Sequence, residues 1–293
     1  ALHLPDLPAP VLPAIEGTHN LVITGVGGTG VVTIGAVLAQ AAQLEVQLSG
    51  GQRSWSSSEL LGHPQARDIQ IDEDVSYKRP MRYRAVPIST LLDGVSAGDH
   101  LQAVALDGFA AELPAATLLA REGAKAWLAI EDPQHPWPPL AKGKPSAGPF
   151  YLVWTDPAAS QIGPEQWPFQ VARIRQLAAV EQRFPALLPA ADASAEVRTG
   201  FALYQKNCMA CHRLNGAGDS EFGPDLNIPY NPTEYFTGDF LRQYIRNPQS
   251  LRRWPQGRMP GFTQQVLSEQ ELTELITYLA HMADIRDQRS ESQ

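Results

Sequence analysis

The sequence predicts a multidomain protein in which a mainly-β or α+β domain is followed by a small all-α domain. With 293 residues, the chain is long enough for two domains of ordinary size. Short β-branched runs and Pro-rich connectors fill its middle, which is typical of strands and loops. Near the carboxyl end, apolar residues recur with helical spacing over 195–207, 238–247 and 268–282. The predicted segments are 1–45, 46–190 and 191–293.

The composition restricts the class of protein. Apolar residues make up 43% of the chain and charged residues 18%, so we expect a globular protein rather than a disordered chain or a long helical rod. The formal net charge of -8 leaves no broad basic surface for phosphates, so nucleic acid is not a predicted partner. The two cysteines, Cys208 and Cys211, are too few for a disulfide framework.

A Gly-rich segment near the amino end has the spacing of a dinucleotide-binding loop. The apolar run 21–24 leads into the glycines of 25–30, which satisfy G-x-G-x-x-G, and Glu45 is a candidate for contact with a ribose hydroxyl. The residues after Glu45 leave no room for the further parallel strands of a nucleotide-binding fold. We therefore do not expect a working nucleotide site.

The same segment supports two other interpretations. Residues 4–45, above all 20–35, resemble the opening of the last domain of indolepyruvate ferredoxin oxidoreductases. That resemblance implies a cytoplasmic enzyme with thiamine diphosphate and iron-sulfur clusters, but the chain lacks the cysteines, so we interpret the segment as a fused or misjoined fragment. Alternatively, 31–41 is the apolar core of a signal peptide that lacks a positively charged beginning, and the mature chain starts near 42–46.

The middle of the chain alternates strands with a short helix. Residues 81–92 followed by 101–109 have the order strand, short helix, strand, turn. This stretch, continued by 126–130 and 147–154, resembles the molybdopterin-binding domain of the sulfite oxidase family. The resemblance implies a molybdenum held by a protein cysteine, but 46–190 contains no cysteine. We therefore expect a relative without molybdopterin that serves as a docking or scaffolding module.

The other polar residues of this zone give no local site. His63, His100 and His135 are too far apart in the sequence for a metal-binding motif, so we expect each to be an ordinary loop or core residue. The run 131–137 holds two acids and a histidine among prolines, which predicts an extended surface segment rather than a catalytic group.

The run Cys208-Met209-Ala210-Cys211-His212 has the spacing C-x-x-C-H of covalent haem attachment. In such a motif the two thiols add to the vinyl groups of one porphyrin, and the histidine lies under the iron. A zinc knuckle would need a second ligand pair, and a redox dithiol would need a βαβ setting. The sequence offers neither, so we predict one covalent haem c with His212 as an axial ligand.

Residues of about 195–283 resemble class I cytochromes c. The resemblance implies that the carbonyl of Pro224, within Gly223-Pro224-Asp225-Leu226, accepts the ring proton of His212 and orients the imidazole. It also implies a first and a last helix that cross closely, where a glycine permits the approach. The residues concerned are Gly200, Phe201 and Tyr204 on the first helix and Leu275, Tyr278 and Leu279 on the last.

The sixth iron ligand has four methionine candidates. Met209 lies between the two anchors and cannot reach the opposite face, Met282 lies on the last helix where packing is the common role, and Met81 belongs to the middle zone. Met259 lies in a loop flanked by Gly and Pro, as the distal Met of these cytochromes does, so we predict it as the ligand. The alternative is an exposed Met259 with an iron that is open or bound by histidine.

Arginines without interspersed acids form a predicted basic patch. They would anchor the haem propionates or steer a negatively charged partner, unless they are simply a solvated face. Trp254 beside them would cover the haem edge or fill the core. The arginines are Arg242, Arg246, Arg252, Arg253 and Arg258.

These observations predict a monohaem c-type cytochrome that transfers electrons between a dehydrogenase and a downstream acceptor such as a terminal oxidase. Because haem is attached to this motif outside the bacterial cytoplasm, we expect an exported, periplasmic, soluble protein without a transmembrane span. We do not expect it to be an enzyme on its own. The alternatives are a molybdopterin oxidoreductase that reduces its own haem, and a haem-based ligand sensor.

Overall fold

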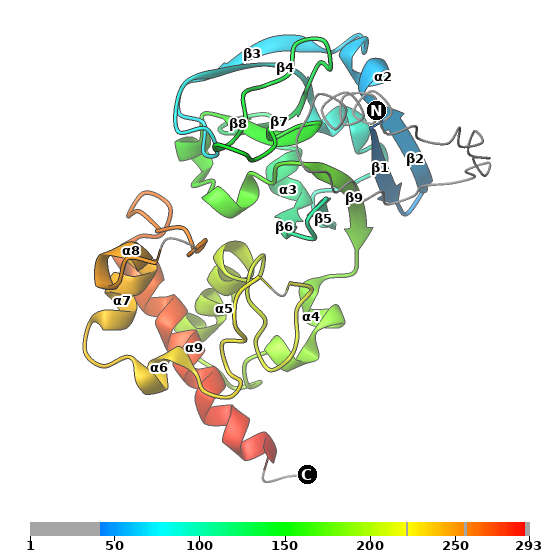
Figure 1. Ribbon diagram of the computed structural model, residues 1–293. Helices are drawn as coiled ribbons and strands as arrows, with labels where there is room; N and C mark the ends of the chain where they lie inside the picture. The colour runs from blue at the N-terminus through cyan, green and yellow to red at the C-terminus, as the bar shows by residue number, and fades with distance from the viewer. Residues whose placement is uncertain (1–41, 221, 255–256, 291–293) are drawn as a thin grey trace, which may run out of the picture. The chain divides into compact units, whose positions relative to one another are not determined.

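The computed structural model describes residues 42–290 apart from 221, 255 and 256. The described residues belong to one compact unit, Ala39–Gln293. The glycine loop at 25–30 and the proposed signal core lie outside the described residues. Within them, strands occupy the first part and helices the second, which confirms a sheet-rich domain followed by a helical one (Figure 1).

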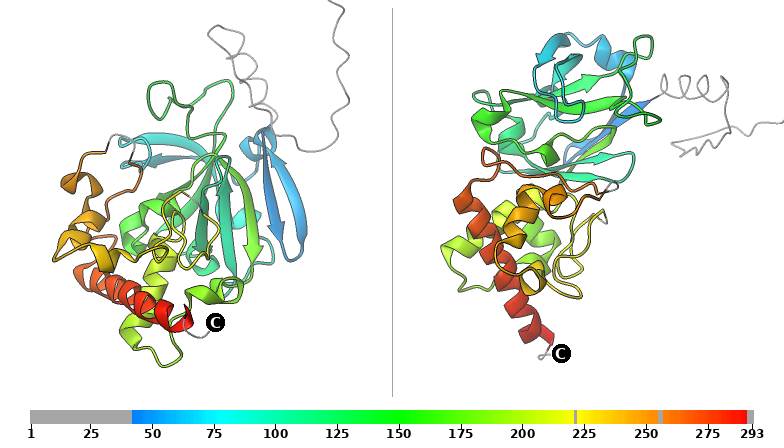
Figure 2. Two further views of the ribbon diagram at one scale, coloured as in Figure 1. Left: turned by 60° about the horizontal axis from the view of Figure 1, so that its bottom comes forward. Right: turned by 60° about the vertical axis from the view of Figure 1, so that its left-hand side comes forward.

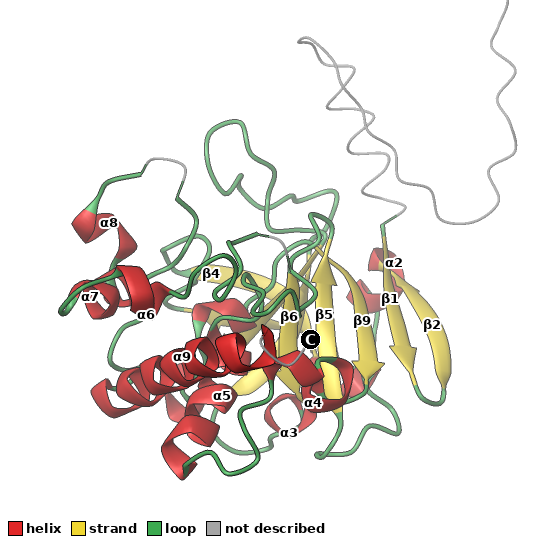
Figure 3. Cartoon of the chain, turned by 90° about the horizontal axis from the view of Figure 1, so that it is seen from below, coloured by secondary structure: helices red, strands yellow, loops and turns green. Residues whose placement is uncertain are grey.

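The first sheet has five strands in the order β2-β1-β9-β5-β6 (Figure 3). Strands β1 and β9 are parallel, and the other neighbours are antiparallel. Because β9 returns from the end of the domain to lie beside β1, this sheet joins the two ends of the sheet-rich segment. The strands are β1 (Gln43–Leu48), β2 (Gly51–Ser56), β5 (His100–Ala105), β6 (Ala110–Pro114) and β9 (Val171–Leu177).

The second sheet has four antiparallel strands in the order β3-β4-β7-β8. In β4 the buried Met81, Tyr83 and Ala85 alternate with the exposed Arg82 and Arg84, as expected of a strand with one face on the core. The continuous apolar run of β8 is buried almost throughout. The strands are β3 (Arg67–Ile71), β4 (Met81–Pro87), β7 (Lys125–Ile130) and β8 (Phe150–Thr155).

Short helices connect these strands, and the predicted order over 81–109 is confirmed. Strand β4 leads into the 3-10 helix η1 (Ile88–Leu91), and β5 then ends at a turn where Gly108 has a φ of +90°. The remaining connectors are α2 (Ser57–Leu61), α3 (Ala115–Leu118), η2 (Pro157–Ser160) and η3 (Pro164–Gln166).

The helical part contains two long helices, and all three predicted helical stretches are present. Helix α5 begins after Ser194, whose hydroxyl accepts a bond from the Val197 amide, and α9, drawn in red in Figure 2, continues past the predicted end at 282. The helices are α4 (Val180–Arg183), η4 (Pro185–Leu187), α5 (Ala195–Asn207), α6 (Pro232–Tyr235), α7 (Phe240–Arg246), α8 (Pro248–Leu251) and α9 (Glu269–Ser290).

Helices α5 and α9 cross closely at Gly200, as predicted. A Cβ at this position would lie 2.1 Å from the Glu274 carbonyl oxygen and 2.6 Å from the Tyr278 Cβ. The rings of Phe201 and Tyr204 lie 5.5 Å and 5.6 Å from the Tyr278 ring. The glycine therefore allows the two backbones to touch while aromatic rings fill the space on either side.

The two hydrophobic cores include residues close to both predicted boundaries. Leu44 is fully buried in the sheet core, so the residues just before the boundary at 45 are part of β1. Val180 and Leu187 pack into the helical core, and the Tyr278 hydroxyl donates to the Leu187 carbonyl at 2.7 Å. Because α4 and η4 already pack in the helical core, the small-residue stretch near 190 connects two parts of the helical domain.

Candidate functional site

The C-x-x-C-H motif continues the last turn of α5. The amides of Cys208 and His212 donate to the carbonyls of Tyr204 and Cys208, each at 2.9 Å. Neither Cys208 nor Cys211 forms a disulfide. Burial raises the pKa of Cys208 and raises that of Cys211 to about 12, with a smaller contribution from the Glu165 carboxylate in each case. These thiols are protonated at neutral pH, whereas a redox dithiol needs a lowered pKa.

The His212 ring is held in one orientation. Its Nδ1 lies 2.8 Å from the Pro224 carbonyl oxygen, which is the contact predicted from the sequence. Since that carbonyl can only accept, Nδ1 carries the proton and Nε2 is left with its lone pair for a metal. Burial lowers the pKa of His212, against a smaller opposing effect of the Pro224 hydrogen bond. The ring is therefore held in the neutral form that binds iron.

Gly223 allows the backbone to approach this ring. A Cβ there would lie 2.4 Å from His212 Cε1, which is closer than any side chain could be placed. The Gly223 amide donates to the Cys211 carbonyl at 2.7 Å. The segment before Pro224 is thus fastened to the motif that it faces.

Asp225 organises the loop after the motif, a role that sequence analysis missed. Its carboxylate accepts hydrogen bonds from the amides of Asn215, Gly216 and Asn227 at 3.2, 2.7 and 2.7 Å. The Asn227 side chain, fully buried, donates to the Met282 carbonyl of α9 at 2.8 Å. The loop that carries Pro224 is therefore anchored to the last helix. An aspartate directly after Gly-Pro was the available signal.

The four methionines lie in different surroundings. Met81 is in the sheet core, whereas Met209 and Met282 are buried in the helical core. Met259 is partly buried and packs against the edge of the helical core. Its loop is held at Gly261, where a Cβ would lie 2.4 Å from the Arg246 carbonyl oxygen. Met259 therefore lies in a fixed loop and is only partly buried, and its ligation of iron stays a prediction.

The predicted basic patch is smaller than the sequence indicated. Arg246 donates to the carbonyls of Phe262 and Leu267 and pairs with Glu269 at 2.8 Å. Arg242 donates to Thr273 at 2.9 Å and also lies near Glu269. The sequence analysis missed this acid because α9 brings it from outside the arginine-rich stretch.

Three arginines of the patch remain exposed. Arg252, Arg253 and Arg258 form no ion pair with any described residue. The Arg252 guanidinium lies 4.7 Å from the centre of the Trp254 ring, and Trp254 is 54% exposed. The hypothesis that Trp254 fills the core is therefore wrong. The exposed patch consists of Arg252, Arg253, Trp254 and Arg258.

His100 is more than an ordinary core residue. Its ring contacts the Glu112 carboxylate, which also pairs with Arg183 at 2.8 Å. Arg183 reaches Asp219, in the loop after the haem motif, at 2.7 Å. Gln102 donates to both carboxylates. This network joins the sheet-rich segment to the loop that follows His212.

The remaining sequence candidates have structural roles. Glu45, the candidate for contact with a ribose, instead forms an ion pair with Arg173. Its carboxylate lies 2.6 Å from the Arg173 guanidinium, across the pair of strands β1 and β9. His135 is exposed and lies 2.9 Å from Asp132, on the predicted surface segment. His63 packs edge-on against Trp55 at 6.0 Å. Among the described residues, no group of three or more His, Cys, Asp or Glu could hold a metal ion.

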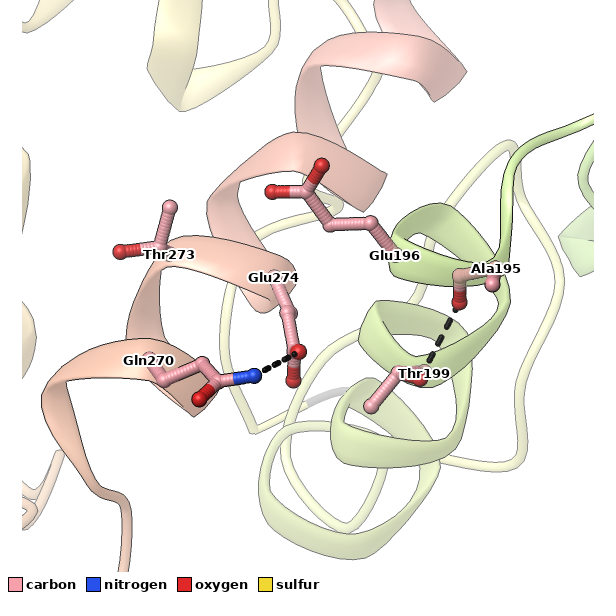
Figure 4. A pocket seen from close by; sticks show the side chains of 6 residues that line it. All are labelled: Ala195, Glu196, Thr199, Gln270, Thr273 and Glu274. Atoms are coloured by element: carbon pink, nitrogen blue, oxygen red, sulfur yellow. Dashed lines mark hydrogen bonds between the residues drawn. The ribbon is translucent and has the colours of Figure 1, made fainter.

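A surface hollow of about 410 Å³ lies between α5 and α9 (Figure 4). Some of its polar contacts are internal to one helix, since Gln270 donates to Glu274 at 3.0 Å and Thr199 donates to the Ala195 carbonyl at 3.1 Å. Another joins the two helices, because Thr277 of α9 donates to Glu196 of α5 at 3.2 Å. None of its lining residues belongs to the haem motif or to the Met259 loop. The residues are Ala195, Glu196, Thr199, Gln270, Thr273 and Glu274.

Comparison with known proteins gives one family match. Residues 197–283 match the family model of cytochrome c. The carboxyl-terminal region therefore contains a cytochrome c domain, a class that carries haem and transfers electrons. No curated protein sequence matches the chain. Among solved structures, the sulfane dehydrogenase SoxCD from Paracoccus pantotrophus is similar with a TM-score of 0.35 and 20% identity, over 50% of this chain and 41% of that chain.

The residues of the helical domain fit a haem c. The free thiols of Cys208 and Cys211 have the spacing of haem attachment. The His212 imidazole donates its Nδ1 proton to a carbonyl, and the Met259 thioether lies in an anchored loop. Soft sulfur and imidazole donors are those that cytochromes offer to haem iron. The candidate haem site therefore consists of Cys208 and Cys211 as covalent anchors and of His212 and Met259 as candidate iron ligands.

Proposed function

We propose that the protein is a periplasmic monohaem cytochrome that transfers electrons between a dehydrogenase and a downstream acceptor. Cys208 and Cys211 hold the haem covalently, and His212 and Met259 are the axial ligands. The bound haem supplies a site that gains and loses one electron. The observation that carries this proposal is the orientation of His212, whose Nδ1 is engaged by Pro224 within a C-x-x-C-H turn.

The surrounding residues keep the ligand geometry constant. Pro224 fixes the imidazole tautomer, Gly223 lets that carbonyl reach the ring, and Asp225 holds their loop. The Tyr204 hydroxyl donates to the His212 carbonyl at 2.9 Å, so the backbone of the ligand is held as well. A ligand that does not move between oxidation states lowers the reorganisation needed for electron transfer, in the same way as other preorganised sites.

The exposed patch of Arg252, Arg253, Trp254 and Arg258 is the proposed docking surface. It lies in the loop region that leads to Met259, and its positive charge contrasts with the net charge of -8 of the whole chain. Such local asymmetry steers a partner with an acidic surface and affects the association rate more than the affinity. The proposed partner is therefore a redox protein with an acidic docking face.

The sheet-rich domain is proposed as a docking or scaffolding module that binds no molybdopterin. It has no cysteine with which to hold molybdenum.

None of the described helices is long and apolar enough to cross a membrane. The proposed periplasmic location follows from the chemistry of the motif, because haem attachment to C-x-x-C-H takes place outside the bacterial cytoplasm.

Haem content and ligation are tested on the purified full chain. We expect one haem per chain that stays bound after denaturation, and a low-spin spectrum. Replacing Met259 by Leu should abolish the Met-to-iron charge-transfer band and give a high-spin or open iron, whereas the matched Met81→Leu variant should retain the wild-type spectrum. An unchanged spectrum in Met259→Leu would favour the ligand-sensor alternative. Near-stoichiometric molybdenum would instead support the molybdopterin oxidoreductase.

A further inference from the structure

Glu165 is a buried carboxylate that the proposed function does not use. It lies on η3, between β8 and β9, and is 5% exposed. Neither Oε1 nor Oε2 has a hydrogen-bond partner among the other described residues. Because an unpaired buried carboxylate is strongly destabilising in its charged form, a native protein that retains one calls for an explanation.

The η3 segment packs against the haem-attachment turn. A Cβ on Gly163 would lie 3.2 Å from Val266 Cγ1, 3.2 Å from Glu165 Oε2 and 3.4 Å from Asn207 Oδ1. Asn207 directly precedes Cys208, and the Glu165 charge acts on both thiols of the motif. The segment that carries the carboxylate therefore lies against the residue that precedes the first haem anchor.

The neighbouring amide side chain of Asn207 does not stabilise a negative charge. Asn207 Nδ2 is already used by the Leu203 carbonyl at 3.1 Å, which leaves Oδ1, an acceptor, buried without a partner. An acceptor can receive a hydrogen bond from a protonated carboxyl but not from a carboxylate. The surroundings therefore favour the neutral form of Glu165.

Few charged groups face Glu165 from the elements packed around it. Lys206 of α5 is attractive but is itself half-buried and also feels Glu271 of α9. Glu112 of β6 is engaged by Arg183 and His100. Asp107 acts on Cys211, and after haem attachment both cysteines are uncharged thioethers. The haem iron would then be the neighbouring centre whose charge changes during function.

We propose that Glu165 exchanges a proton with solvent in step with the oxidation state of the haem. When the iron passes from ferric to ferrous, it gains one electron and the Glu165 carboxylate takes up at most one proton per haem. When the redox partner removes the electron, the carboxyl releases that proton. This inference rests on the proposed attachment of haem to Cys208 and Cys211.

The direction of the coupling follows from charge. Ferric iron carries one more positive charge than ferrous iron, so it stabilises a nearby carboxylate, and its reduction makes protonation more favourable. Burial raises the pKa of Glu165 to about 8, against smaller opposing effects of its own backbone amide and of Lys206. Proton binding and release consequently fall in the range in which the protein would work.

The reduction potential of the haem therefore falls as pH rises through this range. At low pH Glu165 is neutral in both oxidation states of the haem. At high pH it is charged in both states, and its negative charge then stabilises the ferric form relative to the ferrous form. A tenfold difference in proton affinity between the two states corresponds to a total fall of 59 mV, and no fall is expected without coupling.

The test is a spectroelectrochemical titration of the haem-loaded full chain between about pH 5 and pH 10, a range that includes the raised pKa on both sides. We expect a falling potential in the wild type and in the Glu122→Gln control, an exposed residue of the same domain. Glu165→Gln should remove the fall that belongs to this residue. A pH-independent wild type, or an undiminished fall in Glu165→Gln, would overturn the inference.

A second measurement needs no variant. Electrochemical reduction of the wild type in weakly buffered solution near pH 8, followed with a pH indicator dye, should show uptake of a fraction of one proton per haem. Absence of uptake would overturn the role of Glu165 even if the Gln variant fails to fold. A chain that carries no haem at all would instead overturn the proposed function and, with it, this inference.

Discussion

The region of the second sheet and the surroundings of the haem motif each contain a buried carboxylate, but only the first of these carboxylates is hydrogen-bonded to other residues. Asp74 in the sheet region accepts hydrogen bonds from the hydroxyls of Tyr83 and Tyr151 at 2.7 and 3.3 Å and from the amides of Ser76 and Tyr77 at 2.9 and 2.8 Å. Glu165 accepts none from described residues. A carboxylate with a structural role is expected to accept hydrogen bonds at both oxygens. A carboxylate without partners is tolerated where its change of protonation state has a function.

The two tyrosines make the Asp74 site rigid. Burial is the main cause of the raised pKa values of Tyr83 and Tyr151, and the Asp74 carboxylate adds to it. Both hydroxyls therefore stay protonated and remain donors over the whole physiological range. The sheet core thus contains a carboxyl group with permanent donors, in contrast to the exchangeable proton proposed for Glu165.

The largest expected effect comes from removing Asp74. Asp74→Ala leaves two tyrosine hydroxyls and two backbone amides without their acceptor in the buried core, and we expect a loss of roughly 3–5 kcal/mol in the free energy of unfolding. Urea unfolding of the full chain measures it. Glu73→Ala, at the exposed neighbouring position, is the control and should change stability by less than about 0.5 kcal/mol. Equal stability of the two variants would contradict the structural role of Asp74.

The pH dependence of stability provides a test at Glu165. Its folded-state pKa of about 8 lies above the ordinary value of 4.5, so the folded state binds the proton more tightly than the unfolded state. The resulting stabilisation is complete below pH 4.5 and is lost as pH rises from there to about 8. It amounts to at most about 5 kcal/mol.

Comparison of wild type with Glu165→Gln isolates this contribution from the other titrating groups. The variant cannot ionise, so its stability relative to wild type should increase between pH 5 and pH 8.5, within the window given by the raised pKa. Unfolding by guanidinium at several pH values measures the difference. A constant difference across this range would mean that Glu165 is hydrogen-bonded in solution, as Asp74 is.

The helix crossing is the next site to test. In Gly200→Ala the new methyl group meets the Glu274 carbonyl and Tyr278, so the helices must separate and we expect a loss of about 1–3 kcal/mol. Ala202→Ser, on the exposed face of α5, serves as control and should change little. Thermal unfolding followed by circular dichroism distinguishes them. A Gly200→Ala variant as stable as the control would show that α5 and α9 are farther apart.

A local pattern and a family resemblance together predicted much of the cytochrome domain. The attachment motif follows from residues close in sequence, whereas the crossing at Gly200 and the contact between His212 and Pro224 were implied by the resemblance to class I cytochromes c. The sheet-rich character of the middle segment also followed from its apolar periodicity. These features could be found because their chemistry requires particular residue types at fixed separations.

The features that sequence analysis missed depend on distant residues. Arg183 joins Glu112 and Asp219, which are far apart in the chain, and nothing in the sequence pairs them. Glu165 follows a proline in what looks like an ordinary polar loop, and its burial is decided by the packing of η3. Arg246 was assigned to a surface patch because its partner Glu269 comes from α9. In each case tertiary structure determines whether a charge is free or engaged.

The smallest expected effect concerns the exposed arginines, whose free charges contrast with the engaged Arg242 and Arg246. Arg252→Glu combined with Arg253→Glu should slow reoxidation of the reduced haem by hexacyanoferrate(III) at low salt, by up to about tenfold, because the anion is no longer attracted. Reoxidation by the cation hexaammineruthenium(III) should instead become faster in this variant, because the repulsion by the two arginines is removed. Both differences should disappear at about 1 M salt, where the screening length is about 3 Å. Arg82→Glu combined with Arg121→Glu, which makes the same change in net charge at two exposed positions of the sheet domain, is the matched control and should alter neither rate appreciably. Equal effects of the two variants would mean that net charge governs the encounter, whereas a selective effect of Arg252 and Arg253 would locate electron exit at the loop region that leads to Met259.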